Sequence, residues 1–220
     1  MRVAIAGAGN VGRSIAKELV ENGHEVLLIE REPRRVKPDS VAGAQWLLAD
    51  ACEIASLERA QLQRFETVVA ATGDDKVNLV VALLAKTEYC VPRVVARINH
   101  PKNEWLFTES WGVDTAVSTP RLLSALVEEA VTVGDVVRLM TFRRGEVNLV
   151  ELTMPPDVPL IGQRVGSVQW PPDCRLVAIL RGSRVLDPLE VDNTLEAGDE
   201  LVFMALPEAE KQLHDLLVQA

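Results

Sequence analysis

Gly7-Ala8-Gly9-Asn10-Val11-Gly12 is the stretch that decides the fold of the N-terminal half of this chain. The apolar segment Arg2–Ala6 precedes it, and the segment Val11–Glu21 that follows places its apolar side chains on one helical stripe. The glycines therefore lie where a buried strand turns into a helix, which is the context that gives a G-x-G-x-x-G pattern its meaning. The first glycine permits the tight turn, the second lets a pyrophosphate approach the backbone, and the third lets the helix pack close to the strand. We expect the amides at the helix start to face anionic phosphates.

A second buried strand is predicted over Glu25-Val26-Leu27-Leu28-Ile29-Glu30, and it ends in a carboxylate. The spacing from the glycines to Glu30 is typical of the acidic residue that accepts ribose hydroxyls in dinucleotide-binding folds. A carboxylate there repels a 2′-phosphate, so the residues favour NAD(H) or another plain adenosine nucleotide over NADP(H). Arg31 leaves NADP(H) open as an alternative ligand, because an arginine near this point can accommodate a 2′-phosphate. A Rossmann-like domain with a degenerate site is the other interpretation.

Strands alternate with helices along the rest of the first half. Further strands are predicted over Gln45–Leu48, Thr67–Ala71, Arg93–Arg97 and Thr115–Val117, and helices over Leu57–Phe65 and Val77–Lys86. This rhythm predicts an α/β fold with a Rossmann-like, doubly wound parallel sheet, in which ligands bind beyond the C-terminal ends of the strands. The candidate nucleotide-binding residues all fall at those ends: Gly7, Ala8, Gly9, Asn10, Val11, Glu30, Asp50, Ala51, Thr72, Gly73 and Arg97.

Three other features of the first half have a structural and a functional interpretation. The basic, proline-broken run Arg31–Pro38 predicts a solvated loop rather than a rim for nucleotide phosphates. Asp74-Asp75 predicts a solvated turn rather than a cation site. Three of the four tryptophans are expected to serve core or subunit packing rather than base stacking, namely Trp46, Trp105 and Trp111.

A helix with one wide apolar stripe follows the sheet. Thr119 can cap it, with Pro120 at its first position. The stripe consists of Leu122, Leu123, Leu126, Val127, Ala130 and Val131. The pattern alone leaves two partners for this stripe, a second subunit or the helix's own sheet.

From Gly134 onward the alternation of strands and helices stops, and consecutive strands are predicted. Strands are predicted over Val136–Phe142 and Val147–Met154 around the turn Arg143-Arg144-Gly145, then over Leu176–Leu180, Arg184–Leu186 and Glu200–Met204, with a closing helix over Pro207–Val218. We therefore predict two domains, residues 1–133 as the nucleotide-binding domain and residues 134–220 as a small α+β domain. The second is near the lower size limit for a self-sufficient core, so dimerisation would stabilise it.

Composition excludes several classes of protein. The 220 residues carry a formal net charge of −9, which argues against nucleic acid as the main partner. No apolar run reaches the length of a membrane span, and Met1-Arg2-Val3 enters a strand at once, which leaves no room for a signal peptide. The three cysteines and three histidines are scattered, so we expect no metal site and a reducing cytoplasm.

The whole chain resembles the cytoplasmic regulatory subunits of Trk/Ktr-type potassium uptake systems, which are built from an RCK (or KTN) N-domain and a small RCK C-domain. In the first half the likeness lies in Gly7–Ser14, Gly23–Val26, Glu30, Asp50-Ala51, Ala71–Asp75 with Asn78-Leu79, and Val95–Arg97. In the second half it lies in Leu160–Gly162, Val177–Arg181 and Leu195–Leu201.

This resemblance implies a non-catalytic subunit that binds an adenine nucleotide and gates a membrane potassium transporter. It implies self-association through the 120–131 helix into dimers or rings, with or without a related RCK chain, at the inner face of the cell membrane. It also assigns roles: the glycine stretch to the phosphates, Glu30 to a ribose, Asp50-Ala51 to the adenine, Thr72-Gly73 to the pocket floor and Arg97 to phosphate. ATP-preferring members place an arginine where this chain has Asn10, so NAD(H) is favoured, with ATP and ADP as alternatives.

The rival interpretation is an NAD-dependent oxidoreductase. Such an enzyme needs a proton donor beside the hydride site. Tyr89 is the single tyrosine, and the residue four positions later is Arg93 rather than the lysine that a short-chain dehydrogenase uses. A redox-sensing DNA-binding repressor is disfavoured in turn, because the sequence shows neither a helix-turn-helix pattern nor a basic face.

Overall fold

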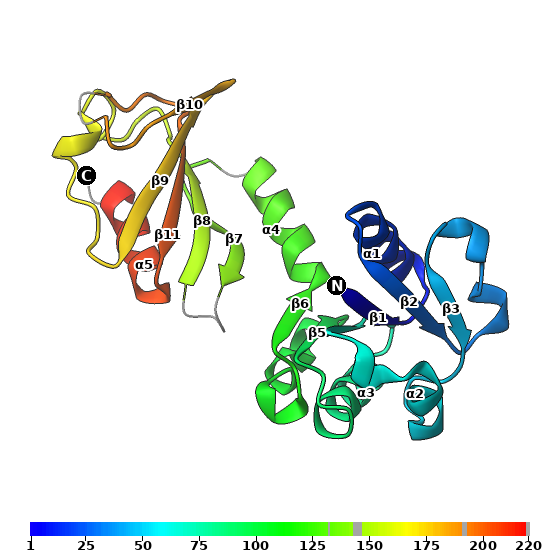
Figure 1. Ribbon diagram of the computed structural model, residues 1–220. Coiled ribbons are helices and arrows are strands. Elements are labelled where there is room, and N and C mark those ends of the chain that lie inside the picture. The colour runs from blue at the N-terminus through cyan, green and yellow to red at the C-terminus, as the bar shows by residue number, and fades with distance from the viewer. Residues whose placement is uncertain (132, 143–146, 191–192, 219–220) are drawn as a thin grey trace. The chain divides into compact units, whose positions relative to one another are not determined.

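The computed structural model describes residues 1–131, 133–142, 147–190 and 193–218. The chain divides into two units, Met1–Pro120 and Arg121–Ala220, and each is described by itself (Figure 1). The division predicted from the sequence, between residues 133 and 134, places the helix after the sheet in the first domain and remains a prediction.

The first unit is built on a six-stranded sheet of order β3-β2-β1-β4-β5-β6, with every neighbouring pair parallel. Its strands are β1 (Arg2–Ala6), β2 (Glu25–Glu30), β3 (Gln45–Leu48), β4 (Thr67–Ala70), β5 (Arg93–Ile98) and β6 (Thr115–Ser118). Its helices are α1 (Asn10–Glu21), α2 (Ile54–Ala60) and α3 (Asp75–Thr87). This strand order is that of the Rossmann fold, so the predicted fold class is confirmed.

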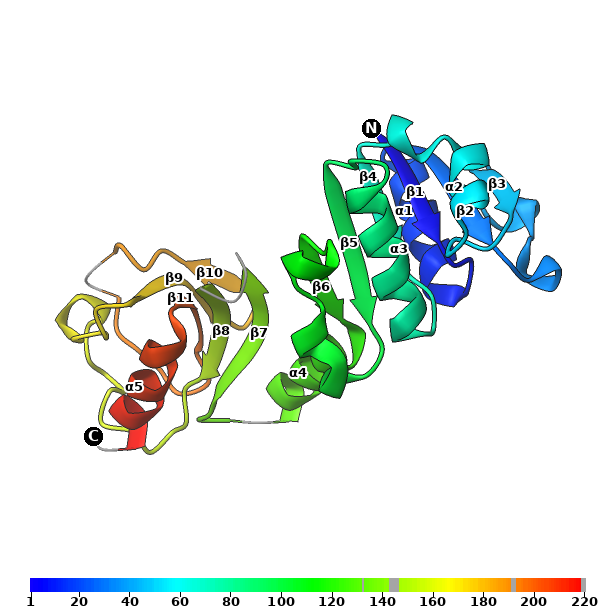
Figure 2. The ribbon, with the colours of Figure 1, turned by 90° about the horizontal axis from the view of Figure 1, so that it is seen from below.

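Helices cover both faces of this sheet. Alternate residues of β1 point to opposite faces, so Val3 and Ile5 pack with α1, while Ala4 and Ala6 pack with α2 and α3. Figure 2 shows α3 lying along β4 and β5. Because both faces are buried, the central strands are almost wholly apolar, as parallel sheets require. Strand order reverses between β1 and β4, and ligands of such sheets bind at the carboxyl ends there.

Two helix boundaries differ from those predicted, for local reasons. The helix predicted over Leu57–Phe65 is instead α2, which ends before Gln61 in the left-handed region (φ 53°), followed by a short 3₁₀ turn at Leu62–Arg64. The turn lets both Leu57 and Leu62 reach the core. Helix α3 begins two residues earlier than predicted because the Asp74 side chain caps it, accepting hydrogen bonds from the amides of Lys76 (2.8 Å) and Val77 (3.5 Å).

The second unit holds an antiparallel sheet of order β10-β9-β11-β8-β7. Its strands are β7 (Val136–Phe142), β8 (Val147–Thr153), β9 (Cys174–Arg181), β10 (Arg184–Leu186) and β11 (Glu200–Ala205), and its helix is α5 (Pro207–Val218). Helix α5 packs on one face of the sheet through Ala209 and Leu213, over a core that includes Val150, Leu152 and Phe203. The small α+β architecture is thus as predicted. The predicted turn at Arg143-Arg144-Gly145 lies outside the described residues.

Helix α4 (Thr119–Val131) follows β6 directly. The apolar stripe predicted on it is solvent-exposed at Leu123, Leu126, Val127 and Val131. These four side chains therefore do not pack on the helix's own sheet, so that alternative is wrong for them. A second subunit remains the other predicted partner. The side chain of Ala130 lies outside the described residues. Across the described chain, no helix combines the length and the apolar character needed to cross a membrane.

Candidate functional site

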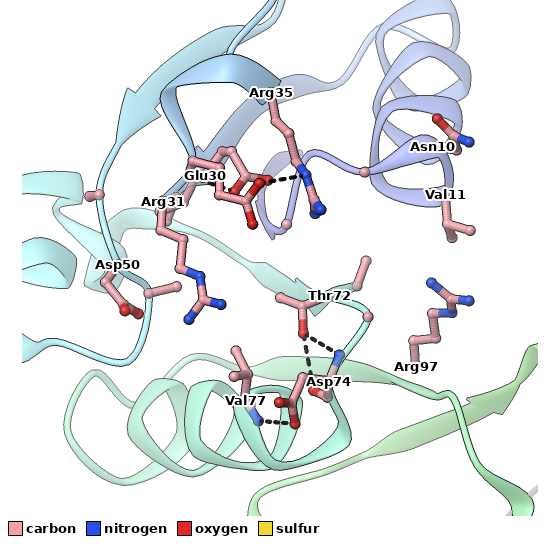
Figure 3. Close-up of a pocket in the computed structure, with 18 residues that line it drawn as sticks. Asn10, Val11, Glu30, Arg31, Arg35, Asp50, Thr72, Asp74, Val77 and Arg97 are labelled. Carbon is pink, nitrogen blue, oxygen red and sulfur yellow. Dashed lines mark hydrogen bonds and ion pairs between the residues drawn. The ribbon is translucent and has the colours of Figure 1, made fainter.

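A cavity of about 520 Å³ opens at the carboxyl ends of the parallel strands (Figure 3). Residues from five segments far apart in the sequence line it, and they include every predicted site residue except Ala8: Gly7, Gly9, Asn10, Val11, Glu30, Asp50, Ala51, Thr72, Gly73 and Arg97. The structure therefore brings the predicted residues together at one place. Their individual roles in binding stay predictions.

The glycine turn fits tightly between β1 and α1. Gly7 has a φ of +99°, and the backbone of Thr72 lies about 3.0 Å from where its Cβ would be. A Cβ on Gly12 would lie 1.9 Å from the carbonyl oxygen of Gly7, whereas one on Gly9 would meet no atom within 4 Å. The first and third glycines are therefore needed for close backbone packing, and Gly9 leaves open space at the cavity wall. The first amides of α1 face this space and can donate hydrogen bonds to an anion.

Glu30 is a buried carboxylate held in a fixed position at the end of β2. It is 5% exposed. Its Oε2 accepts a hydrogen bond from the amide of Ala8 (2.8 Å), and its Oε1 accepts one from the amide of Glu32 (2.9 Å). Ala8 is buried and belongs to the site through this backbone bond. Each carboxylate oxygen keeps further acceptor capacity, so Glu30 can accept hydrogen bonds from the two hydroxyls of a ribose.

The basic loop after β2 contributes two arginines that the sequence interpretation placed in solvent. Arg31 and Arg35 both line the cavity, as does Glu32. Arg35 forms an ion pair with Glu32 (3.0 Å), and Figure 3 shows Arg31 on the same side of the cavity as Asp50. Both side chains are solvent-exposed, as a solvated loop predicts, and they border the cavity as well. A short 3₁₀ turn spans Pro33–Arg35, and residue composition alone does not reveal that this loop borders the cavity.

Cys52 lies beside this part of the cavity and is not a reactive thiol. Burial, together with the carboxylate of Asp50, raises the pKa of the Cys52 thiol to about 11. The thiol therefore stays protonated at neutral pH, and a thiolate is the reactive form. Its packing, rather than chemistry, accounts for its place in the core.

Arg97 supplies a cation at the other end of the cavity. Its side chain extends from β5 toward the start of α1 (Figure 3), and its Nε donates a hydrogen bond to Oγ1 of Thr119 at the start of α4 (3.2 Å). Within the described part of the chain, Arg97 forms no ion pair with a carboxylate. A guanidinium without a carboxylate partner that faces the glycine turn is suited to bind phosphate.

Asp75 has a structural role that the sequence interpretation missed. It is 5% exposed, and its carboxylate accepts hydrogen bonds from Asn99 N (2.6 Å), Asn99 Nδ2 (2.9 Å), His100 N (3.0 Å) and Asn103 Nδ2 (2.8 Å). The solvated turn predicted at Asp74-Asp75 is thus wrong for Asp75, which fixes the loop after β5, whereas Asp74 is exposed and caps α3. Among the described residues, no group of three or more acidic, histidine or cysteine side chains is arranged to hold a metal ion.

Asp75→Asn is expected to destabilise the first unit at neutral pH and much less in acid. Burial alone would raise the pKa of Asp75, but the hydrogen bonds from Asn99, Asn103 and His100 outweigh it and lower the pKa. A carboxyl whose folded pKa lies below its unfolded value of about 3.9 adds stability above that pH and loses it as the pH falls through the folded pKa. We expect a loss of about 1.5–3 kcal/mol at pH 7, typical of hydrogen bonds to a charged group.

Denaturant unfolding at several pH values between neutral and acid measures this difference. Asp39→Asn, a change to an exposed carboxylate of the same unit, is the control and should leave stability nearly unchanged. A difference between Asp75→Asn and the unaltered protein that stays constant down to strong acid would contradict the assignment.

The tryptophans differ in their surroundings. Trp46 is partly buried against the core cluster that contains Val41, as expected, whereas Trp105 is 74% exposed. Core packing is therefore wrong for Trp105, and its role in a subunit contact remains a prediction.

The sheet order, the glycine turn and the buried Glu30 define a Rossmann-like protein of the nucleotide-binding class, with an antiparallel domain appended. The TrkA-N domain family matches residues 3–119, and the TrkA-C domain family matches residues 149–218. The chain therefore belongs to the TrkA family, and the resemblance to regulatory subunits of potassium uptake systems is confirmed.

Two relatives match this chain over almost their whole length. The chain is 59% identical over 218 residues to the Trk system potassium uptake protein TrkA of Mycobacterium tuberculosis, covering 99% of both chains. It is 30% identical over 213 residues to a TrkA homolog of Methanothermobacter thermautotrophicus, covering 96% of this chain and 97% of that relative. Among solved structures it resembles the GsuK channel bound to NAD, with a TM-score of 0.70 and 15% identity over 98% of this chain and 39% of that one. At that identity the likeness shows the fold alone.

Proposed function

We propose that this protein is the regulatory subunit of a Trk-type potassium uptake system, which binds an adenine nucleotide and thereby gates a potassium-translocating membrane subunit. The observation that carries the proposal is the 59% identity, over 99% of both chains, to a protein named for Trk potassium uptake. The cavity adds independent support, because its lining suits a nucleotide in the part of the sheet where Rossmann folds bind ligands.

NAD(H) is the proposed ligand, with ATP and ADP as alternatives. The cavity volume of about 520 Å³ lies within the usual range for small-molecule sites. The glycine turn and Arg97 would hold the phosphates, Glu30 a ribose, Asp50 and Ala51 the adenine, and Thr72 and Gly73 the floor. Asn10 is neutral, so the glycine turn lacks the extra cation that a terminal phosphate of ATP would favour. GsuK, which shares the fold, has been solved with NAD bound.

Arg97 offers a route from the nucleotide to α4. Its guanidinium lines the cavity and also donates a hydrogen bond to Thr119, the first residue of that helix. A phosphate that draws the guanidinium toward the glycine turn would weaken the bond to Thr119 and change the preferred position of the helix start. Ligand binding shifts such an equilibrium only by its difference in affinity for the two states. We propose that this difference arises at Arg97.

A non-catalytic role is part of the proposal. Tyr89, the residue that an oxidoreductase would need as a proton donor, does not line the cavity and donates its hydroxyl to the carbonyl of Ile54 (3.0 Å). Burial, with Glu58 and Glu88 nearby, raises the pKa of Tyr89, which is opposite to the shift that activates a catalytic tyrosine. Absence of NADH turnover by the purified protein, with an acceptor series present, is the expected result.

The partners follow from the same proposal. We propose that residues 120–131 associate with a second copy, giving dimers or rings, alone or with a related RCK chain. The membrane partner is a potassium-translocating subunit, so the protein would be cytoplasmic and peripheral to the inner face of the cell membrane. The proposed domain limits are residues 1–133 and 134–220.

Glu30→Ala is expected to lower the affinity for NADH about tenfold or more, since a hydrogen bond to a charged group contributes about 1.5–3 kcal/mol. Calorimetric titration of the full chain with NADH, NAD, ATP and ADP measures the loss and ranks the ligands. Glu25→Ala is the matched control, because Glu25 is an exposed glutamate at the opposite end of the same strand. Failure of the unaltered protein to bind any of the four nucleotides would overturn the proposed sensor.

A further inference from the structure

We infer that Asn78 is a positioning residue of the nucleotide site: its buried side-chain amide fixes Thr72, just after β4, and the backbone of Arg97, near the end of β5, in the geometry that receives the phosphates. This inference rests on the proposed function of the cavity. Asn78 does not line the cavity itself, so it acts through the two residues that it holds.

Every hydrogen-bonding position of the Asn78 amide is used on these two residues. The side chain lies in the first turns of α3 and is 0% exposed. Its Oδ1 accepts hydrogen bonds from Thr72 N (2.9 Å) and Thr72 Oγ1 (2.6 Å). Its Nδ2 donates to Thr72 O (3.2 Å) and to Arg97 O (2.8 Å). An amide side chain has two donor hydrogens and two acceptor lone pairs, so no other residue type of similar size can make all four bonds.

These bonds begin where the sheet's own ladder ends. The parallel pairing of β4 with β5 runs from Thr67↔Arg93 to Ala70↔Ala96. Thr72 and Arg97 lie just beyond the last pair, and both line the cavity. The Asn78 amide therefore connects the two chain segments beyond the end of the strand ladder, where the ligand would lie, and Asn99 Nδ2 adds a further bond to Thr72 O (3.0 Å).

Thr72 also passes this restraint to the glycine turn. The backbone nitrogen and Cα of Thr72 lie about 3.0 Å from the position that a Cβ on Gly7 would occupy, so the two segments are in tight contact. A displaced Thr72 would disturb the turn that is expected to hold the pyrophosphate. Asn78 thus restrains the backbone from which the Arg97 side chain extends and, through Thr72, the turn at Gly7.

The test compares Asn78→Ala with Leu79→Ala in the full chain. Leu79 is the next residue of α3 and is buried in the core, so its truncation destabilises the same helix without touching Thr72 or Arg97. We expect both variants to unfold at a lower temperature. Calorimetric titration with NADH should show an affinity loss of about tenfold or more for Asn78→Ala, because a misplaced Arg97 would lose its charged hydrogen bond to the phosphate. Leu79→Ala should show little loss. Equal affinities for Asn78→Ala and Leu79→Ala would overturn the inference.

A double-mutant cycle separates positioning from general destabilisation. If Asn78 acts through Arg97, the affinity loss of Asn78→Ala combined with Arg97→Ala is smaller than the sum of the two single losses. Losses that simply add would contradict action through Arg97.

Asn78→Asp serves as a second variant if the alanine variant does not fold. It keeps the shape and both acceptor contacts to Thr72 but loses both donated bonds while the new carboxyl is ionised. Protonation restores one donor, so its NADH affinity should rise as the pH falls, relative to the unaltered protein. An affinity ratio that is constant with pH would count against the inference. NADH binding by the unaltered protein distinguishes the two claims, because its absence defeats the proposed function itself.

Discussion

Gly12→Ala is expected to abolish stable folding of the first unit. The added Cβ would lie 1.9 Å from the carbonyl oxygen of Gly7 and 3.0 Å from its carbonyl carbon. These are backbone atoms of a turn in which Gly7 itself has a φ of +99°, and the amide of Gly7 is bonded to Ile29 O (2.8 Å). The turn therefore cannot move aside, and α1 must shift away from β1. Overpacking of a core costs about 1–3 kcal/mol when flexible side chains can adjust. The atoms in this contact belong to the backbone, so no side chain can move to relieve it.

Gly9→Ala provides the matched control for this prediction. A Cβ at Gly9 would meet no atom within 4 Å, and its backbone, with φ −66°, is in the extended region that alanine adopts readily. We expect Gly9→Ala to keep the unfolding temperature nearly unchanged and to weaken NADH binding, because the methyl group enters the space left for phosphate. Thermal unfolding followed by circular dichroism, with calorimetric titration, measures both effects. Similar unfolding temperatures for Gly12→Ala and the unaltered protein would contradict the packing argument.

The same glycine turn explains why the fold could be predicted from the sequence. The Rossmann topology depends on a local pattern, namely apolar strands at regular intervals with a glycine turn between the first strand and the first helix. Both β1 and β2 have the predicted bounds, because a short apolar run between turns specifies a buried strand almost alone. The site could be predicted in outline for the same reason: in a parallel sheet, the strand ends identified from sequence meet at one edge.

The residues that were missed depend on contacts between distant segments. Asp75 looks like a turn residue in sequence, and only the folded loop at Asn99–Asn103 supplies the four donors that make it structural. Arg31 and Arg35 line the cavity because their loop follows β2, whose end lies at the same sheet edge as the ends of the neighbouring strands. Asn78 lies on an apolar helix face, where a polar residue at zero exposure is the signal that a bonded partner exists. Periodicity cannot identify that partner.

Helix α4 presents four apolar side chains that stay exposed within the part of the chain that the structure describes. Leu123, Leu126, Val127 and Val131 are between 55% and 76% exposed. Their spacing of three, four and eight residues from the first places them on one face of the helix. Contiguous exposed apolar surface of this kind typically marks an interaction site. A second copy of the helix offers an identical apolar surface, and a two-fold contact is self-complementary.

Leu126→Glu is therefore expected to convert the assembled protein into monomers. The glutamate would lie within the proposed contact in both copies, where it loses water without gaining a cation and also repels its equivalent. Because Leu126 is 57% exposed within its own chain, the change should leave the fold of each monomer intact. Light scattering after size-exclusion chromatography, over a range of protein concentrations, measures the mass, and circular dichroism checks the fold.

Leu189→Glu is the control for this prediction, since Leu189 is an 82% exposed leucine of the second unit outside the α4 stripe, and its replacement adds the same charge. The unaltered protein and Leu189→Glu should have the mass of a dimer or a larger assembly, while Leu126→Glu should have half of the dimer mass or less. An unchanged mass for Leu126→Glu would show that the α4 stripe is not the self-association surface. If the prediction holds, Leu126→Glu also tests the link between assembly and nucleotide binding.

Thr119 begins α4 and bonds to Arg97, which lines the cavity. Coupling between two sites is reciprocal, so loss of assembly at α4 should also change the affinity for NADH.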